Sequence, residues 1–145
     1  MKRVIFIATA VIMVVSLVAL WLNQRAARHQ TLTVGDATVQ VELADTASLR
    51  ERGLGGRSSL DQAAGMLFIF RAPGRYGFWM KDMKFPIDII WIADGRIVDI
   101  APEVQPDLPL QTYFPRASAL WVLEVNGGFA ALHHLKIGDA VTYKK

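Results

Sequence analysis

Residues 87–101 read IDIIWIADGRIVDIA, and this stretch decides the expected fold. Two apolar runs, 87–93 and 96–101, flank the dipeptide Asp94-Gly95. Isoleucine, valine and tryptophan favour strands, and an Asp-Gly pair between two such runs is the strongest short-range signal of a β-hairpin. The stretch therefore predicts two antiparallel strands joined by a tight turn.

The same alternation of apolar residues, broken by turn residues, continues outward in both directions. It predicts further strands at 32–34, 37–43, 66–70, 76–80, 119–125 and 140–143, short helices at 47–52 and 129–135, and an irregular proline-containing loop at 102–115. Many short strands with two small helices indicate a mainly-β single domain, either a compact barrel or a sandwich. Of the two forms, we expect the β-barrel-like one.

The basic residues of the chain are concentrated at its N-terminus. The 145 residues include 16 Lys and Arg against 13 Asp and Glu. Residues 1–29 contain four cations (Lys2, Arg3, Arg25 and Arg28) and no acid, which leaves the rest with a formal charge of −1. A basic nucleic-acid-binding domain is therefore not expected. The absence of cysteine excludes a disulfide framework, a thiolate nucleophile and a zinc-thiolate site.

Residues 4–22, VIFIATAVIMVVSLVALWL, form an apolar run that only Thr9 and Ser16 interrupt. As a helix it would span roughly 28 Å, close to the hydrocarbon thickness of a bilayer. A cleavable signal peptide has a shorter apolar region and small residues at its cleavage site, whereas residues 20–24 are mostly bulky. Against the alternatives of a signal peptide or a buried core helix, the run predicts an uncleaved signal-anchor. We accordingly divide the chain into residues 1–29, anchor and linker, and residues 30–145, an exported β-rich domain.

The orientation of this anchor is set by more than its flanking charges, because two cations precede the span and two follow it. The span opens the chain and one globular domain follows it. We therefore expect a single-pass protein of the inner membrane, with its N-terminus inside and its C-terminal domain on the periplasmic face.

Two acidic residues occupy apolar strands. In the run 87–93, Asp88 shares a face with Ile90 and Ile92, and in the later strand Glu124 shares a face with Val122. Both faces of these strands are otherwise apolar. An unpaired carboxylate among apolar side chains costs several kcal/mol or is held neutral by a raised pKa. Both acids therefore need partners, and Arg57, Lys81 and Arg116 are the cations placed where they could reach them.

These acids and nearby polar residues define a candidate site. One interpretation is a polar pocket that binds a small polar ligand, or in which two carboxylates divide acid and base roles. The other is an ion-pair network that fixes loops to the strands. The candidate residues are Arg57, Trp79, Lys81, Asp82, Asp88 and Glu124.

Other chemical signals are weak. His133 and His134 are neighbours and would point about 100° apart in a helix, so we expect no metal. No Gly-x-Ser-x-Gly elbow and no phosphate-binding loop is present, and we expect no cofactor. The aromatic residues, Trp79 and Trp91 among them, are expected in the core, with a sugar-stacking platform as the alternative.

Several motifs together resemble one family. They are RGLGGR at 52–57, GMLFIF at 65–70, FWMKDM at 78–83 with FPID at 85–88, LEVNGG at 123–128 and KIGD at 136–139. Over residues 37–143 the chain resembles the family called domain of unknown function 192, small bacterial and archaeal proteins that often have an N-terminal export segment. The resemblance implies a compact β-rich barrel, no established activity, and signature positions at Arg57, Trp79, Met80, Lys81, Asp88 and Glu124. Asp82 stands where the family pattern often has Asn.

These observations favour binding over catalysis. We expect a membrane-anchored extracytoplasmic domain that binds a partner protein or a small polar ligand at the membrane surface. The alternatives are a hydrolase or lyase that uses Asp88 and Glu124 as an acid–base pair, and an accessory subunit of an envelope complex that makes contact through residues 102–115.

Overall fold

The computed structural model describes residues 12–18, 29–106 and 111–144. Residues 12–18 form a short helix with exposed side chains. The remainder of the expected membrane span 4–22, and most of the linker that follows it, lie outside the described residues. None of the helices in the described part has the length and apolar character needed to cross a membrane.

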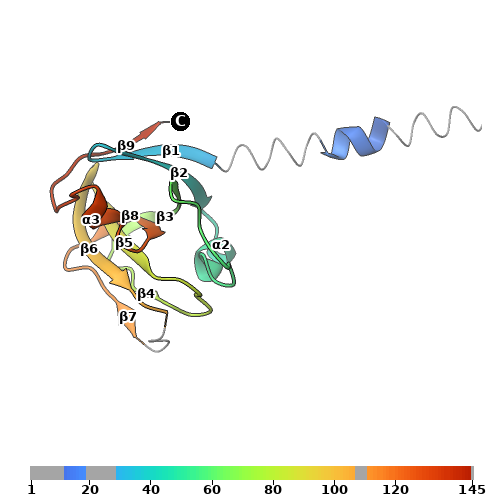
Figure 1. Cartoon of the computed structure of the whole chain (residues 1–145). Coiled ribbons are helices and arrows are strands. Elements are labelled where there is room, and N and C mark those ends of the chain that lie inside the picture. The colour runs from blue at the N-terminus through green and yellow to red at the C-terminus, as the bar shows by residue number, and fades with distance from the viewer. Residues whose placement is uncertain (1–11, 19–28, 107–110, 145) are drawn as a thin grey trace, which may run out of the picture.

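The domain is built on one seven-stranded sheet with the strand order β6-β5-β8-β3-β2-β1-β9 (Figure 1). Neighbouring strands are antiparallel except β2 and β3, which are parallel. A separate two-stranded ribbon pairs β4 with β7. The strands are β1 (His29–Val34), β2 (Ala37–Ala44), β3 (Ala64–Gly74), β4 (Phe78–Trp79), β5 (Ile87–Ala93), β6 (Arg96–Val104), β7 (Thr112–Tyr113), β8 (Ala119–Asn126) and β9 (Val141–Lys144).

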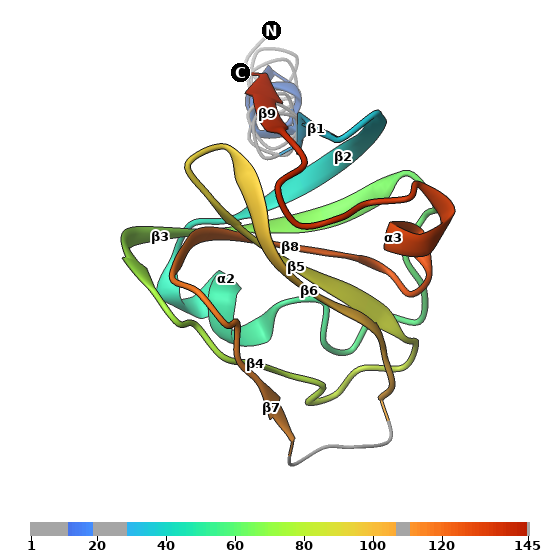
Figure 2. The ribbon, with the colours of Figure 1, turned by 90° about the vertical axis from the view of Figure 1, so that its left-hand side faces the viewer.

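The sheet curls into a half-barrel, so the expected barrel-like form is only partly correct (Figure 2). The start of β6 meets the chain that leads into β9. There the N–H of Ile97 donates to the Asp139 carbonyl at 3.0 Å, and the N–H of Val141 donates to the Gly95 carbonyl at 2.8 Å. These bonds join the two edges at one end only, and β5 and β6 shift register twice along their length, as β-bulges do.

The parallel pair β2–β3 needs a crossing connection, and residues 45–63 supply it. This connection contains helix α2 (Ala47–Arg52). The Thr46 hydroxyl accepts a hydrogen bond from the Leu49 N–H at 3.3 Å, as an N-cap does. Gly53 ends the helix, and its φ of 52° is one that glycine adopts without strain. The expected helix, its cap and its stop are therefore confirmed.

Apolar side chains form two cores, one on each face of the sheet. The inner core takes residues from all seven strands and packs against α3 (Phe129–Leu132). The outer core lies under α2, the following loop and β4. Strands β5 and β8 lie between the two cores, which explains why most of their side chains are buried and none is exposed.

Some element boundaries differ from those expected. The proline-containing stretch is less irregular than predicted, because β6 extends through Pro102 to Val104 and residues 112–113 form β7. The helix expected at 129–135 closes after one turn, at Leu132. Strand β3 is longer than predicted, because its last residue, Gly74, pairs with Ala119 after a register shift. These strand pairings join segments that are far apart in the sequence, and the alternation of apolar residues within one segment does not predict them.

Candidate functional site

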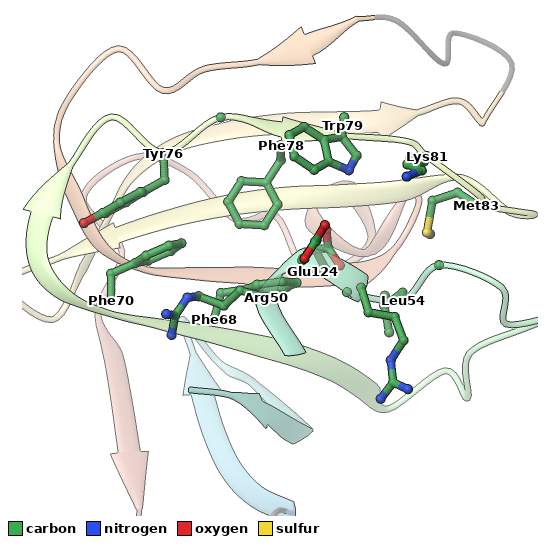
Figure 3. A pocket seen from close by; sticks show the side chains of 15 residues that line it. Arg50, Leu54, Phe68, Phe70, Tyr76, Phe78, Trp79, Lys81, Met83 and Glu124 are labelled. Carbon is green, nitrogen blue, oxygen red and sulfur yellow. The ribbon is translucent and has the colours of Figure 1, made fainter. Parts of the chain in front are cut away.

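A cleft of about 300 Å³ opens on the outer face of the sheet (Figure 3). Helix α2 and the loop after it form one side, and β3, β4 and the residues after β4 form the other. Its lining consists of aromatic and apolar side chains, several charged ones and three glycines: Arg50, Glu51, Arg52, Gly53, Leu54, Gly55, Phe68, Phe70, Tyr76, Gly77, Phe78, Trp79, Lys81, Met83 and Glu124.

Glu124 lies at the floor of this cleft, near Phe68, Phe78 and Leu54 (Figure 3). Glu124 is 4% exposed. The backbone N–H of Leu54 donates a hydrogen bond to the carboxyl group, but Oε2 has no hydrogen-bond partner. Burial raises the pKa of Glu124 to about 8, against the opposing effects of Arg57 and of the Leu54 N–H. The carboxyl group is therefore largely protonated at neutral pH.

Gly53 places no side chain against this carboxyl group. A Cβ atom at position 53 would lie 3.6 Å from Glu124 Oε2 and 3.4 Å from Cζ of Phe68. A side chain at this position would therefore occupy the space next to the unpaired oxygen. The glycine that ends α2 therefore leaves the space beside Oε2 free of a side chain.

Aromatic rings form the walls of the cleft. Phe68 and Phe78 meet edge to face, with ring centroids 4.8 Å apart, and Phe70 stacks on Tyr76 at 3.5 Å. Trp79 is 47% exposed at the rim, so the expectation that it lies in the core is wrong. The alternation along β4 explains this difference, because Phe78 points inward and its neighbour must point outward.

Two loops hold the mouth of the cleft in place. The N–H of Gly56 donates to the carbonyl of Asp82 at 2.8 Å, and Asp82 has a positive φ of 58°. A Cβ at Gly55 would lie 3.2 Å from the Lys81 carbonyl oxygen, so the loop after α2 closely approaches the backbone that follows β4. A wider, open hollow adjoins the mouth on the outside. It shares five residues with the cleft and adds Ser48, Gly56, Asp82 and Lys84.

Asp88 lies on the opposite face of the sheet from Glu124. Asp88 is paired with Val125, whereas Ile89 is paired with Glu124, so the two carboxyl side chains project to different sides. The acid–base pair of Asp88 and Glu124, on which the alternative of a hydrolase or lyase depends, is therefore not formed, because the register between the two strands places the acids in different cores.

Backbone groups satisfy the carboxylate of Asp88. Its Oδ1 accepts hydrogen bonds from the N–H groups of Glu103 at 2.7 Å and Gly128 at 3.0 Å. Its Oδ2 accepts one from the N–H of Ala130 at 2.6 Å. Asp88 is fully buried, and these bonds tie the ends of β6 and β8 and the start of α3 together. The cation that the sequence suggested as its partner is not needed.

The expected cations have other partners. Arg57 forms a two-pronged ion pair with Glu42, at 2.7 and 2.8 Å, which raises the pKa of the guanidinium. Arg116 pairs with Asp99 at 2.6 Å, and its hydrogen bonds lower the pKa of that carboxyl group. Lys81 lines the cleft and makes no ion pair within the described part of the chain.

The structure thus divides the predicted cluster. Trp79, Lys81 and Glu124 line the cleft, and Asp82 lies in the adjoining hollow. Arg57 acts on Glu124 only through space, and Asp88 is elsewhere. The sequence pattern did not predict the aromatic walls of the cleft. The i, i+2 spacing of Phe68 and Phe70 does place these two rings on one face of β3, and Tyr76 and Phe78 come from the segment that follows.

One protonated carboxyl group among aromatic walls can hydrogen-bond to a ligand or exchange a proton with it. Over residues 12–18, 29–106 and 111–144, no group of three or more His, Cys, Asp or Glu side chains could hold a metal ion. The geometry is that of a small-molecule pocket, apolar inside with few polar groups.

Comparisons with known proteins agree with this architecture. A structure from Novosphingobium aromaticivorans DSM 12444, of a protein of unknown function, matches with 33% identity and a TM-score of 0.75, over 79% of this chain and 84% of that one. A structure from Sinorhizobium meliloti 1021, described as a candidate transcription regulator, matches with 30% identity and a TM-score of 0.75, over 79% of this chain and 93% of that one. A search of curated proteins gave no match. The family model DUF192, described as "Uncharacterized ACR, COG1430", matches residues 30–143, and the chain belongs to this family.

Proposed function

We propose that this chain is a membrane-tethered binding protein that takes a small polar ligand into the cleft above Glu124. One observation carries the proposal: Oε2 of Glu124 is buried, lacks a hydrogen-bond partner and lies beside the cleft. A buried polar atom without a partner costs about 1–3 kcal/mol. A ligand that hydrogen-bonds to this atom recovers that free energy, whereas a purely structural carboxyl group would have found a partner within the domain, as Asp88 does.

A thermal-shift screen of the full-length chain in detergent micelles tests this proposal. Envelope metabolites and glycans are added, and the melting temperature of the wild type is compared with that of Trp79→Ala, which removes part of the rim. Arg71→Gln is the matched control, because Arg71 is exposed and does not line the cleft. We expect at least one compound to stabilise the wild type and the control more than Trp79→Ala. Equal shifts in all three proteins would place binding outside the cleft and contradict the proposal.

The membrane location is part of the same proposal. The nineteen-residue apolar run 4–22 supports an uncleaved anchor, with the domain on the periplasmic face of the inner membrane. A compartment-sensitive reporter fused after residue 145 tests the orientation. Activity of a reporter that works only outside the cytoplasm is expected. Activity restricted to a cytoplasmic reporter would overturn the proposed orientation. It would not affect the proposal that the cleft binds a ligand.

A partner protein is the second candidate. Trp79 is 47% exposed and Phe114 is 59% exposed, and both belong to or follow the ribbon β4–β7. Exposed aromatic residues are common at protein interfaces. Cross-linking in intact membranes, followed by identification of captured proteins, tests this candidate with Phe114→Ser as the variant. A cross-linked species that persists unchanged in the variant would place the interface elsewhere.

A further inference from the structure

The cleft and the hollow at its mouth form one continuous site with two unlike halves. Glu51, Arg52, Gly55, Lys81 and Met83 line both of them. The inner half is walled by aromatic rings, and the outer half is lined mostly by charged and small residues. A ligand that fills both halves therefore needs an apolar part and a polar part.

The floor of the inner half carries no negative charge that would attract a cation at neutral pH, because its other acidic residue, Glu51, lies where the two halves meet. Its one deep polar group is Glu124, and burial raises the pKa of that carboxyl to about 8. Arg50 is already engaged, because it donates to the carbonyls of Asp45 at 2.7 Å and Ile69 at 3.0 Å and lies over the ring of Phe70. The inner half thus suits an uncharged apolar or aromatic group with one hydrogen-bonding atom.

The outer half carries cations that are free to meet an anion. Arg52 and Lys81 line both halves, and neither makes an ion pair or a side-chain hydrogen bond among the residues that the structure describes. Across both halves there are four cations (Arg50, Arg52, Lys81 and Lys84) and three acids (Glu51, Asp82 and Glu124), of which Glu124 is the buried one. The net charge of the lining is therefore positive.

We propose that the ligand is an organic anion whose apolar body fills the aromatic half above Glu124 and whose carboxylate or phosphate lies at the mouth between Arg52 and Lys81. The inference rests on the proposed function and adds the chemical class of the ligand. The buried carboxyl group hydrogen-bonds to an oxygen or nitrogen atom of the body, and the guanidinium and ammonium groups hold the anion.

Four probes with an aromatic ring on a short chain test the charge preference. They are 3-(4-hydroxyphenyl)propanoate, 2-(4-hydroxyphenyl)ethyl phosphate, the neutral 3-(4-hydroxyphenyl)propanamide and 3-(4-hydroxyphenyl)propylammonium, each with a phenol oxygen that Glu124 can reach. Isothermal titration into the full-length chain in micelles at pH 7, with empty micelles as the blank, gives each affinity. We expect one or both anions to bind at least about fivefold more tightly than the amide, and the ammonium to bind most weakly.

Variants separate the contributions of the two halves. The double variant Arg52→Gln, Lys81→Met is expected to weaken the anionic probes about tenfold and to leave the affinity of the amide unchanged. Trp79→Ala is expected to weaken every probe that binds in the cleft, and Arg71→Gln is the surface control. Raising the pH to 9 ionises Glu124 and should weaken the anions, and Glu124→Gln should remove that dependence on pH.

Each outcome decides a different question. If the ammonium or the amide binds at least as tightly as the anions, and Trp79→Ala weakens that binding, the proposal of an anionic ligand is wrong. The proposal that the cleft binds a ligand then stands. Anion binding that the double variant does not weaken would also overturn the inference, because the mouth would not hold the charge. If none of the four probes binds at millimolar concentration, the inference fails, and the screen of envelope compounds then decides the proposed function separately.

Discussion

Asp88 and Glu124 are buried carboxyl groups on adjacent strands with different surroundings. Asp88 accepts three backbone N–H hydrogen bonds, whereas Glu124 receives one from Leu54 and leaves Oε2 unpaired. A buried group with all its partners fixes the chain around it, and one that lacks a partner is available to a ligand. The two residues therefore call for different experiments.

Replacing Asp88 by asparagine is expected to destabilise the domain. The amide nitrogen cannot accept a hydrogen bond, so at least one of the N–H groups of Glu103, Gly128 and Ala130 loses its partner. We expect Asp88→Asn to lower the free energy of unfolding by roughly 2–4 kcal/mol, measured by urea denaturation. Binding of any ligand that fills the cleft should be retained in the folded fraction. An unchanged stability with lost binding would instead return Asp88 to the functional site.

Replacing Glu124 by glutamine is expected to change how stability depends on pH. The pKa of Glu124 is about 8 in the folded protein and 4.5 in its ordinary state. The folded state therefore holds a proton that the unfolded state releases, and the wild type loses stability as the pH rises from about 4.5 to about 8. The loss attributable to this group is roughly 5 kcal/mol at most.

Urea denaturation at pH 5, 7 and 9 measures this effect as the difference between wild type and Glu124→Gln. The variant keeps the acceptor for the Leu54 N–H, lacks the titrating proton and should become progressively more stable relative to the wild type. Glu51→Gln makes the same change at an exposed carboxyl group of α2 and is the control. A constant difference across the three pH values would show that Glu124 does not titrate in this range.

Alternation along single strands predicts the burial of Asp88 and Glu124, and the structure confirms it. It does not predict which faces of the two strands coincide, because that depends on the register between segments 36 residues apart in sequence, where Asp88 meets Val125 and Ile89 meets Glu124. A shift of one residue would have put both acids in one core. The acid–base interpretation failed for this reason.

At the scale of elements, helix α2 carries part of the cleft wall although only the partly buried Leu49 packs it against the outer core. Arg50, Glu51 and Arg52 from the helix line the cleft, yet none of its residues is buried. A helix of six residues has little stability of its own. Its end caps therefore matter more than they would in a packed helix.

Removing the N-cap is expected to loosen this wall. Thr46→Ala deletes the hydroxyl that accepts from the Leu49 N–H, and should cost about 1 kcal/mol of unfolding free energy. Thr46→Ser, which keeps the hydroxyl, is the matched control. Hydrogen exchange should become faster at residues 49–53 in the alanine variant and stay slow in the serine variant. Equal exchange in both would mean that other contacts hold the helix.

The hairpin around Asp94-Gly95 and the caps of α2 are local, and the sequence predicts them well. The ribbon β4–β7 is not local, since it pairs residues 78–79 with residues 112–113. Neither segment has a pattern that reveals its partner, and so the sequence placed Trp79 in the core and residues 112–113 in a loop. The cleft between α2 and β4 depends on this ribbon, which is why its aromatic walls were not predicted.

At the scale of the whole molecule, the half-barrel joins its edge strands at one end. The Ile97 and Val141 N–H groups make hydrogen bonds across this junction. If the junction persists in solution, these two amides should exchange slowly with solvent, at rates close to those of the central strands β5 and β8. Amide hydrogen exchange followed by NMR measures them individually. Rates typical of an exposed strand edge would indicate that the curl opens in solution.

The parallel pairing of β2 and β3 has a consequence for how this fold can diversify. Residues 45–63 must cross the sheet, and they supply one wall of the cleft. No strand register constrains the length of this segment, and doubling a flexible loop costs only about 0.6 kcal/mol. Insertions next to residues 53–56, the loop that lines the cleft and the hollow, could therefore reshape the entrance while the strands stay in place. The crossing segment is a natural position for grafting new selectivity onto an unchanged scaffold.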